Sequence, residues 1–288
     1  MTNYLARLFY LGDNYYGSQK QPGFKTVQGE LIDAIETWSN ENHSSRTIQM
    51  SGRTDRGVHA LGQVVMITSE KPLTVDGINK FLPDDIILWA RAKAPEGFRP
   101  RSSPLLRHYR YFLGDEWKEL DIGRVRHAIS KLAGSRDFGM LSKPDERRNT
   151  VTTVLNMYIE NISGVSFLDV IGTSFLWKFV RKVVTLLMEI GLGTLDSGVI
   201  NEITHGVKRT IRSGIEPAAP ENLLLLETIV PVRFIPSKYG LRKIQKILND
   251  RFNYHLHSMN AFRGIINFFS SSVMPYQSLT SLNNHLQD

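Results

Sequence analysis

Residues 50–65 read Met50-Ser51-Gly52-Arg53-Thr54-Asp55-Arg56-Gly57-Val58-His59-Ala60-Leu61-Gly62-Gln63-Val64-Val65, and this run decides how the rest of the chain is interpreted. Its three glycines are typical of a backbone that adopts positive φ or closely approaches another segment. Asp55 lies between two arginines, and nearby positive charge favours an ionised carboxylate. The run predicts an anionic side chain on a tight loop, with cations beside it that suit phosphate. For Gly-x-x-Asp alone, an Asx-turn with solvated arginines would be the better interpretation.

The composition is that of a globular protein with a moderate excess of basic over acidic residues. The 288 residues allow one large or two modest domains with a substantial core. Lys and Arg number 35 against 28 Asp and Glu, a net charge of +7. This balance suits a polyanionic partner such as nucleic acid, although many basic proteins bind none.

The chain contains no cysteine. A disulfide framework, a thiol nucleophile and a cysteine-bound zinc are therefore excluded, and with them the zinc deaminases that act on bases. The eight histidines lack metal-site spacing, and no Gly-x-Gly-x-x-Gly or P-loop is present. Asp84 and Asp85 follow Pro83, so we interpret them as a helix-ending turn and not as a metal-binding pair. We expect no metal and no cofactor.

Two segments bear on the location of the protein in the cell. The first residues lack the basic and apolar regions of a signal peptide. The most apolar helix candidate, residues 175–195, contains Lys178, Arg181, Lys182 and Glu189, too many charges for a membrane span. We expect a soluble, cytoplasmic protein without membrane contact.

Hydrophobic periodicity predicts an alternation of strands and helices. We expect strands over 4–11, 46–50, 64–68, 86–92, 107–113, 157–162, 165–171 and 223–230, and helices over 27–38, 74–82, 122–132 and 175–192. Several connections are too short for crossovers, which favours antiparallel pairing. The repeated alternation indicates an α+β fold of two halves, residues 1–100 and 101–232.

Residues 233–288 differ in character from the rest. Lys238 to Leu248 predicts a basic amphipathic helix, followed by apolar residues and a Ser/Asn-rich end. We interpret this extension as a helix packed on the body with a frayed end, and a role in contacting RNA or bracing a dimer stays open.

Two further stretches carry candidate functional residues. His108-Tyr109-Arg110-Tyr111-Phe112 places tyrosines on one strand face and Arg110 on the other. It forms either an aromatic platform for a base or a half-buried strand. Phe175 to Val184 buries one helical stripe and carries Arg181, which in isolation would more often be solvated.

Three motifs together resemble the tRNA pseudouridine synthase A family, as an archaeal-like or divergent member. They are Gly-Arg-Thr-Asp-x-Gly-Val-His-Ala-x-Gly-Gln-Val from residue 52, Arg-x-Tyr-Arg-Tyr from 107, and the helix Phe-x-x-x-Phe-Val-Arg from 175, where the family has Met at the fifth position. The resemblance covers about four-fifths of the chain and ends near residue 232. It implies a pseudouridine synthase fold, in which two related α/β halves share a mainly antiparallel sheet with a central cleft.

The resemblance also implies the reaction and its residues. Asp55 corresponds to the catalytic aspartate, Tyr109 to the active-site tyrosine beside the target base, and Arg181 to the arginine that pairs with the aspartate. Arg53, which helps to displace the nucleotide, and Arg56, His59 and Arg110 are expected to bind substrate.

The implied reaction converts uridine to pseudouridine in the anticodon stem-loop of tRNA, at positions 38–40, by a homodimer that binds tRNA. The target must be flipped out at a cost of roughly a few kcal/mol. Attack by Asp55 on the sugar carbon or on the base ring stays open.

A different class of protein, a non-catalytic RNA-binding protein or RNA chaperone, would also be basic and aromatic. It would not need Asp55. A glycoside hydrolase would need two cooperating carboxylates, and the motif supplies one.

Overall fold

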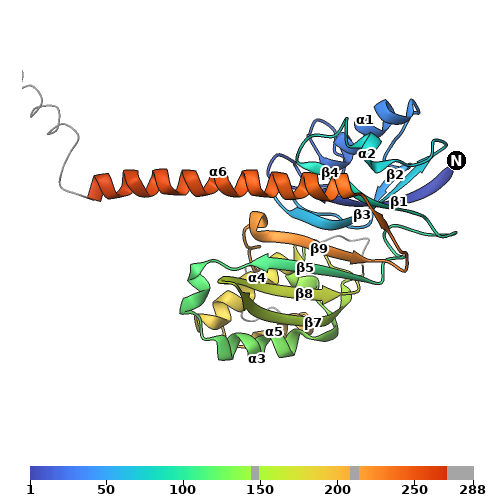
Figure 1. The fold of residues 1–288 in the computed structure, drawn as a ribbon. Helices are drawn as coiled ribbons and strands as arrows, with labels where there is room; N and C mark the ends of the chain where they lie inside the picture. The colour runs from blue at the N-terminus through green and yellow to red at the C-terminus, as the bar shows by residue number, and fades with distance from the viewer. Residues whose placement is uncertain (144–148, 208–213, 271–288) are drawn as a thin grey trace, which may run out of the picture. The chain divides into compact units, whose positions relative to one another are not determined.

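The computed structural model describes residues 1–143, 149–207 and 214–270 (Figure 1). Residues 1–241 form one compact unit and residues 242–288 form another. The Ser/Asn-rich end expected after the last helix lies outside the described residues.

A ten-stranded sheet runs through the first unit, within the described residues, in the order β10-β4-β1-β3-β9-β5-β8-β7-β6, with β2 also paired to β3. Among the described strands every pairing is antiparallel except that of β3 with β9. The expected mainly antiparallel sheet is confirmed. The strands are β1 (Thr2–Tyr10), β2 (Ile48–Met50), β3 (His59–Ser69), β4 (Ile86–Lys93), β5 (Leu106–Phe112), β6 (Gly134–Asp137), β7 (Val151–Ile162), β8 (Val165–Gly172), β9 (Leu223–Ile229) and β10 (Ile235–Pro236).

The parallel pairing of β3 with β9 joins the two halves of the sheet. It is short, with His59 opposite Leu224 and Ala60 opposite Leu225. Further along the same strand, β3 pairs with β2. Its start, directly after the Asp55 loop, therefore lies against the second half of the chain.

The helices of the first unit cover one face of this sheet. They are α1 (Val27–Ser39), α2 (Val75–Ile78), α3 (Ile122–Leu132), α4 (Phe179–Gly191) and α5 (Val199–Thr204). Their buried residues join those of the strands in one continuous core. In Figure 1, α1 and α2 accompany the first-half strands, and α3, α4 and α5 accompany β5, β7 and β8. A smaller apolar cluster around Leu5, Val64, Met66 and Val230 lies on the other face.

Local chemistry accounts for the helix ends. Thr26 caps α1 as predicted, because its hydroxyl accepts a hydrogen bond from the amide of Gly29 at 3.2 Å. The helix expected over 74–82 is shorter, since the Asn79 side chain bonds both the amide and the carbonyl of Leu88 at 2.8 Å. The helix expected from residue 175 begins at Phe179.

The predicted hairpin of β7 and β8 is confirmed. Its turn residues Ser163 and Gly164 have φ angles of 53° and 83°, which match a tight hairpin turn. The short strands β6 and β10 are not predicted by the sequence, because neither has a run of alternating apolar residues long enough to indicate a strand.

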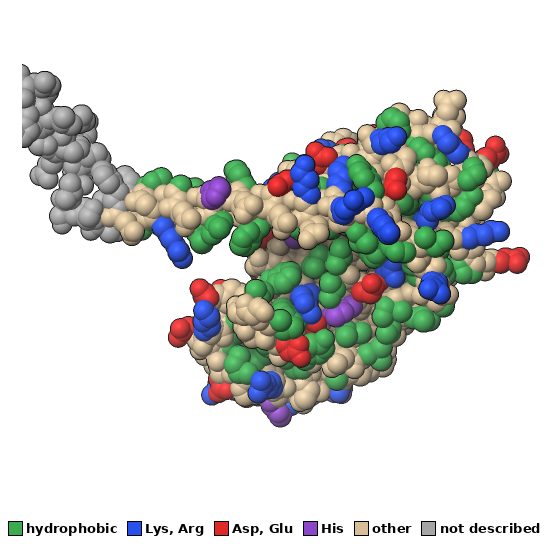
Figure 2. Space-filling view, in the orientation of Figure 1, with side chains coloured by type: hydrophobic (Ala, Val, Ile, Leu, Met, Phe, Trp, Pro, Cys, Tyr) green, Lys and Arg blue, Asp and Glu red, His purple; other side chains and the backbone are tan. Residues whose placement is uncertain are grey.

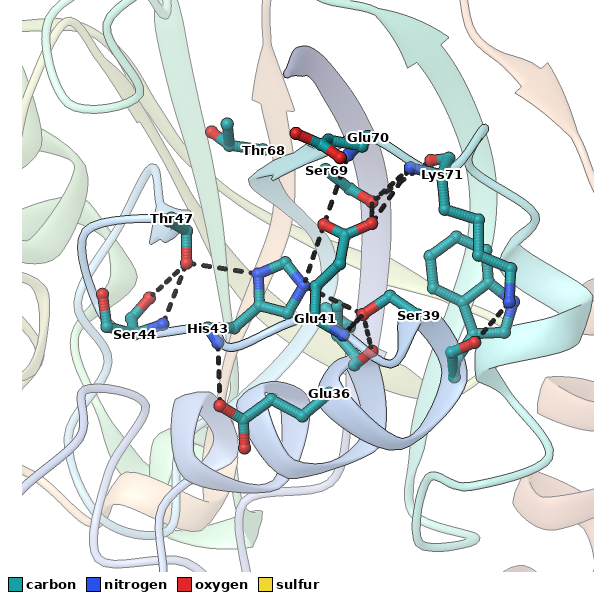
Figure 3. Close-up of polar contacts among 12 residues, drawn as sticks. Glu36, Ser39, Glu41, His43, Ser44, Thr47, Thr68, Ser69, Glu70 and Lys71 are labelled. Atoms are coloured by element: carbon teal, nitrogen blue, oxygen red, sulfur yellow. Dashed lines mark hydrogen bonds and ion pairs between the residues drawn. The ribbon is translucent and has the colours of Figure 1, made fainter.

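A network around Glu41 fixes the connection between α1 and β2 (Figure 3). The carboxylate of Glu41 accepts hydrogen bonds from the Ser69 hydroxyl at 3.0 Å and from the amides of Glu70 and Lys71 at 3.2 and 3.0 Å. Slight burial disfavours its charge, but these donors outweigh burial and lower the pKa of Glu41. The network ties the end of α1 to the end of β3.

Helix α6 (Lys238–Ser270) begins in the first unit and continues through the second, so the predicted helix is confirmed. It exposes apolar side chains such as Phe252 and Phe262, which are 66% and 65% exposed. Among the described residues, no helix is long and apolar enough to cross a membrane.

Candidate active site

The loop that carries Asp55 is held at its base by the side chain of Gln63 on β3. The side-chain amide of Gln63 bonds both backbone groups of Gly52, where the loop begins. Its Oε1 accepts from the Gly52 amide at 2.9 Å, and its Nε2 donates to the Gly52 carbonyl at 3.0 Å. The loop then closes in a turn in which the Val58 amide donates to the Asp55 carbonyl at 3.2 Å. Gly57 has a φ of 84° in this turn, a conformation that side chains rarely adopt. The glycine pattern therefore serves to present Asp55 on a fixed turn.

A second loop, residues 12–18, braces the first from the side. The Ser18 hydroxyl accepts from the Thr54 amide at 2.9 Å, and the Ser18 amide donates to the Thr54 carbonyl at 3.1 Å. The Tyr10 hydroxyl lies 2.7 Å from the Thr54 hydroxyl, and burial raises the pKa of Tyr10 to about 12. At Gly12 a Cβ would lie 2.3 Å from the Val58 carbonyl oxygen, so only glycine fits. Thr54, which precedes Asp55, is thus fixed by buried contacts.

Each carboxylate oxygen of Asp55 accepts a hydrogen bond from the second half of the chain. Arg181 Nη1 donates to Oδ2 at 2.8 Å, and its Nε donates to the Ala218 carbonyl at 2.6 Å. Trp177 Nε1 donates to Oδ1 at 2.7 Å. The side chains of Arg181 and Asp55 are 11% and 20% exposed, so this ion pair is largely shielded from water. The arrangement fixes the orientation of the carboxylate.

Tyr109 lies in the same region on the core face of the sheet. It pairs with Leu225 of β9, and Leu225 pairs with Ala60 of β3, so the three form one row across the joint. Its ring is 7% exposed and meets Phe175 edge-to-face at 5.4 Å. Phe175 in turn stacks on Phe179 at 5.7 Å, at the start of the helix that carries Arg181. Aromatic packing therefore couples Tyr109 to α4.

Arg110 points to the opposite face of the sheet. Its Nε and Nη2 donate to the two oxygens of Asp169, each at 2.8 Å, and its guanidinium covers the Phe167 ring at 3.6 Å. His108 Nε2 lies 3.0 Å from the same carboxylate. Burial disfavours the charge, yet the contacts with Arg110 and His108 hold the pKa of Asp169 well below its usual value. The structure thus does not bring Arg110 to Asp55.

The remaining candidate binding residues lie around the loop. Arg53 is exposed and lines a 150 Å³ hollow together with Arg101, Gly52 and Ser18. Arg56 is exposed and covers the ring of Tyr16 at 4.4 Å. His59 is half-buried, and its Nδ1 accepts a hydrogen bond from the Gly12 amide at 2.9 Å. The arginines are open to a ligand, whereas His59 braces the second loop.

Comparison with known proteins gives the family. A family model described as tRNA pseudouridine synthase matches residues 6–92 and 128–229. The tRNA pseudouridine synthase A of Methanosarcina acetivorans is 37% identical over 82% of this chain and 88% of its own length. Those of Methanosphaera stadtmanae and Archaeoglobus fulgidus are 32% and 34% identical, each over 88% of this chain and 94% of its own.

The chain belongs to the tRNA pseudouridine synthase family. It is therefore an isomerase of tRNA uridine, and the pseudouridine synthase fold expected from its motifs is confirmed. Within the described parts of the chain, no group of three or more His, Asp or Glu side chains is placed to hold a metal ion.

Sequence reasoning missed two contributors to this synthase site. Arg107 Nη2 donates to the Ser51 carbonyl at 3.1 Å and its Nη1 donates to the Thr173 carbonyl at 2.7 Å, so it fastens the Asp55 loop to the second half. The other is Trp177. No sequence signal indicates its role, because Trp177 lies before the start of α4 and the left-handed Lys178 sets its direction.

Proposed function

We propose that this enzyme isomerises uridine to pseudouridine on the 3′ side of the tRNA anticodon stem-loop, at positions 38–40, with Asp55 as the nucleophile. The observation that carries the role of Asp55 is its carboxylate, presented on a rigid turn and oriented by Arg181 at 2.8 Å. The N1–C1′ bond breaks, the base rotates, and a C5–C1′ bond forms; C5 loses its proton and N1 gains one from solvent, so the composition of the nucleoside is unchanged. Tyr109 lies against the base and accepts that proton.

The target nucleotide must leave its stack to reach Asp55. The exposed arginines Arg53 and Arg56 contact the backbone phosphates and offset this cost. Tyr16 and Phe24, 44% and 52% exposed and 4.9 Å apart, add stacking surface beside Arg56. On the face drawn in Figure 2, Lys and Arg side chains are interspersed with acidic and apolar ones. The affinity for tRNA therefore depends on local groups such as Arg56 with Tyr16 and Phe24.

The proposal includes a homodimer that holds tRNA across both subunits, in the cytoplasm. It treats residues 1–100 and 101–232 as two halves of one catalytic domain and residues 233–288 as an extension. The family match in two segments, 6–92 and 128–229, supports this division.

The test uses tRNA transcripts that carry tritium at uridine C5. Wild-type protein should release tritium, and Asp55→Asn should release none while binding tRNA with similar affinity. Asp33→Asn, an exposed change on α1, is the matched control and should retain full activity. Full activity in Asp55→Asn would remove Asp55 from the mechanism. Tight tRNA binding without tritium release by the wild type would instead favour an RNA-binding protein.

A further inference from the structure

The two side chains that hold Asp55 are anchored very differently. Arg181 is buried, lies within α4 and makes a second hydrogen bond to the Ala218 carbonyl at 2.6 Å. Trp177 precedes the helix, its side chain is largely open to solvent at 46% exposure, and its carbonyl accepts a hydrogen bond from the Lys143 amide at 2.9 Å. Lys143 lies over its ring, with Nζ 4.2 Å from the centroid. One carboxylate oxygen is therefore held from the protein interior, and the other is covered from the solvent side.

The backbone between these two residues is strained. Lys178 has φ 66° and ψ 4°, the left-handed region, and it immediately precedes α4. Of the described residues, the other non-glycine residues with positive φ are Asn40 and Ser163, at a helix C-cap and a hairpin turn, where that conformation is common. Lys178 lies at neither kind of position, and its left-handed backbone conformation costs about 1 kcal/mol of conformational free energy. This kink directs the indole of Trp177 to Asp55.

Oδ1 of Asp55, which Trp177 covers, faces the solvent side from which the substrate approaches. Arg181 occupies Oδ2 from the buried side, so a nucleotide from solvent meets Oδ1, to which Trp177 donates. A hydrogen bond to a nucleophilic oxygen occupies one of its lone pairs and lowers its reactivity. We propose that Trp177 is a gate, which covers Asp55 until the flipped uridine displaces it, with Lys178 as the hinge. This inference rests on the proposed role of Asp55 as the nucleophile.

Relaxation of Lys178 to helical φ and ψ would extend α4 by one residue, break the 2.9 Å hydrogen bond from the Lys143 amide to the Trp177 carbonyl, and carry Trp177 away from Asp55. The gate would thus open by lengthening a helix and would release the strain at Lys178. Closing it again after turnover restores the hydrogen bond to Asp55. The gate would keep the nucleophile covered whenever no uridine occupies the site.

The first test compares wild type with Trp177→Phe, which keeps a ring but has no N–H. Without the hydrogen bond to displace, the variant should bind tRNA about threefold to tenfold more tightly. Its single-turnover tritium release at subsaturating tRNA should rise by about the same factor. A tenfold slower release with unchanged affinity would overturn the gate, because the indole would then be holding Asp55 in its reactive position. Tritium release by the wild type tests the proposed function separately.

The second test follows the displacement of Trp177 by its fluorescence. Of the four tryptophans, Trp38 and Trp117 are buried, at 8% and 4% exposure, and Trp89 is half-buried, whereas Trp177 is 46% exposed. The tRNA-dependent change in tryptophan emission should therefore be clearly smaller in Trp177→Phe than in wild type, and the difference between the two proteins is the signal of Trp177. Lys178→Gly removes the strain of the closed form, whereas Lys178→Ala removes only the charge. The glycine variant should bind tRNA about fivefold more weakly than the alanine variant. Equal affinities of the two Lys178 variants, or an emission change of the same size in Trp177→Phe and wild type, would overturn the proposal.

Discussion

The ion pair between Asp55 and Arg181 should be measurable as a coupling energy in a double-mutant cycle. Arg181→Met removes both the 2.8 Å bond to Asp55 and the 2.6 Å bond to the Ala218 carbonyl. Breaking a buried pair costs about 3–5 kcal/mol. Asp55 is one-fifth exposed and keeps its bond to Trp177, so we expect about 3 kcal/mol, at the lower end. Asp55→Asn should cost about 2 kcal/mol, because the guanidinium loses its counter-charge.

The double variant should be destabilised by less than the sum of the single ones. We expect a coupling of about 2 kcal/mol, measured from urea unfolding of all four proteins at neutral pH. Arg124 and Asp121 provide the control cycle, since their side chains are 58% and 56% exposed and lie 3.5 Å apart. Such exposed pairs contribute about 0.5 kcal/mol. A coupling at Asp55 no larger than that of the control would refute the argument that this pair is shielded and orients the carboxylate.

The same pair has a kinetic consequence. Arg181→Lys keeps the charge. The single ammonium of lysine cannot donate to Asp55 and to the Ala218 carbonyl in the directions that the guanidinium of Arg181 does. Loss of one charged hydrogen bond corresponds to about 1.5–3 kcal/mol, so tritium release should slow about tenfold to a hundredfold. Unchanged turnover in Arg181→Lys would show that the orientation of Asp55 does not limit the reaction.

Three further changes test other parts of the molecule. Asp169→Asn should destabilise the protein by about 3 kcal/mol at pH 7 by leaving Arg110 without its counter-charge. Because folding lowers the pKa of Asp169, its carboxylate contributes fully to the free energy of unfolding above the pKa of the unfolded chain, near 4. That contribution is lost as pH falls through the pKa of the folded protein, so the stability difference between wild type and Asp169→Asn in urea unfolding should shrink in acid. A stability difference independent of pH would contradict this. Gly62→Ala should raise the urea sensitivity or prevent folding, because its Cβ would lie 2.5 Å from the Leu226 carbonyl oxygen, and a neutral effect would show that β9 can move. Tyr109→Phe should slow tritium release about a hundredfold or more at unchanged tRNA affinity, whereas weaker binding alone would assign the ring to stacking.

Much of the fold could be predicted because local patterns specify it. Thr26 predicts the start of α1, Ser163-Gly164 predicts the hairpin, and alternating apolar residues predict the long strands. The start of α4 could not be predicted, since apolar residues at helical spacing precede Phe179, yet residues 174–176 are irregular and the left-handed Lys178 separates them from the helix. That conformation is unfavourable for lysine by itself and follows from its surroundings. Sequence pattern therefore does not reveal it.

The site was predictable only where residues lie within one motif. Asp55 and the glycines of its loop are local, and so their role is evident from spacing. Arg110 shows the limit: alternation along β5 places it opposite Tyr109, but its partner Asp169 lies on β8, a strand 59 residues away in the chain. The identity of such a partner depends on strand register, which only the folded sheet defines.

The assembly of the site depends on the joint between the halves of the sheet. Asp55 precedes β3 in the first half, whereas Arg181 and Tyr109 belong to the second. Two parallel residue pairs between β3 and β9 are the backbone contact there. Arg7 of β1 reaches across to pair with Glu227 of β9 and to bond the Thr228 carbonyl at 2.9 Å. Because each half lacks a member of the ion pair, a change that loosens this joint should reduce catalysis before it unfolds either half.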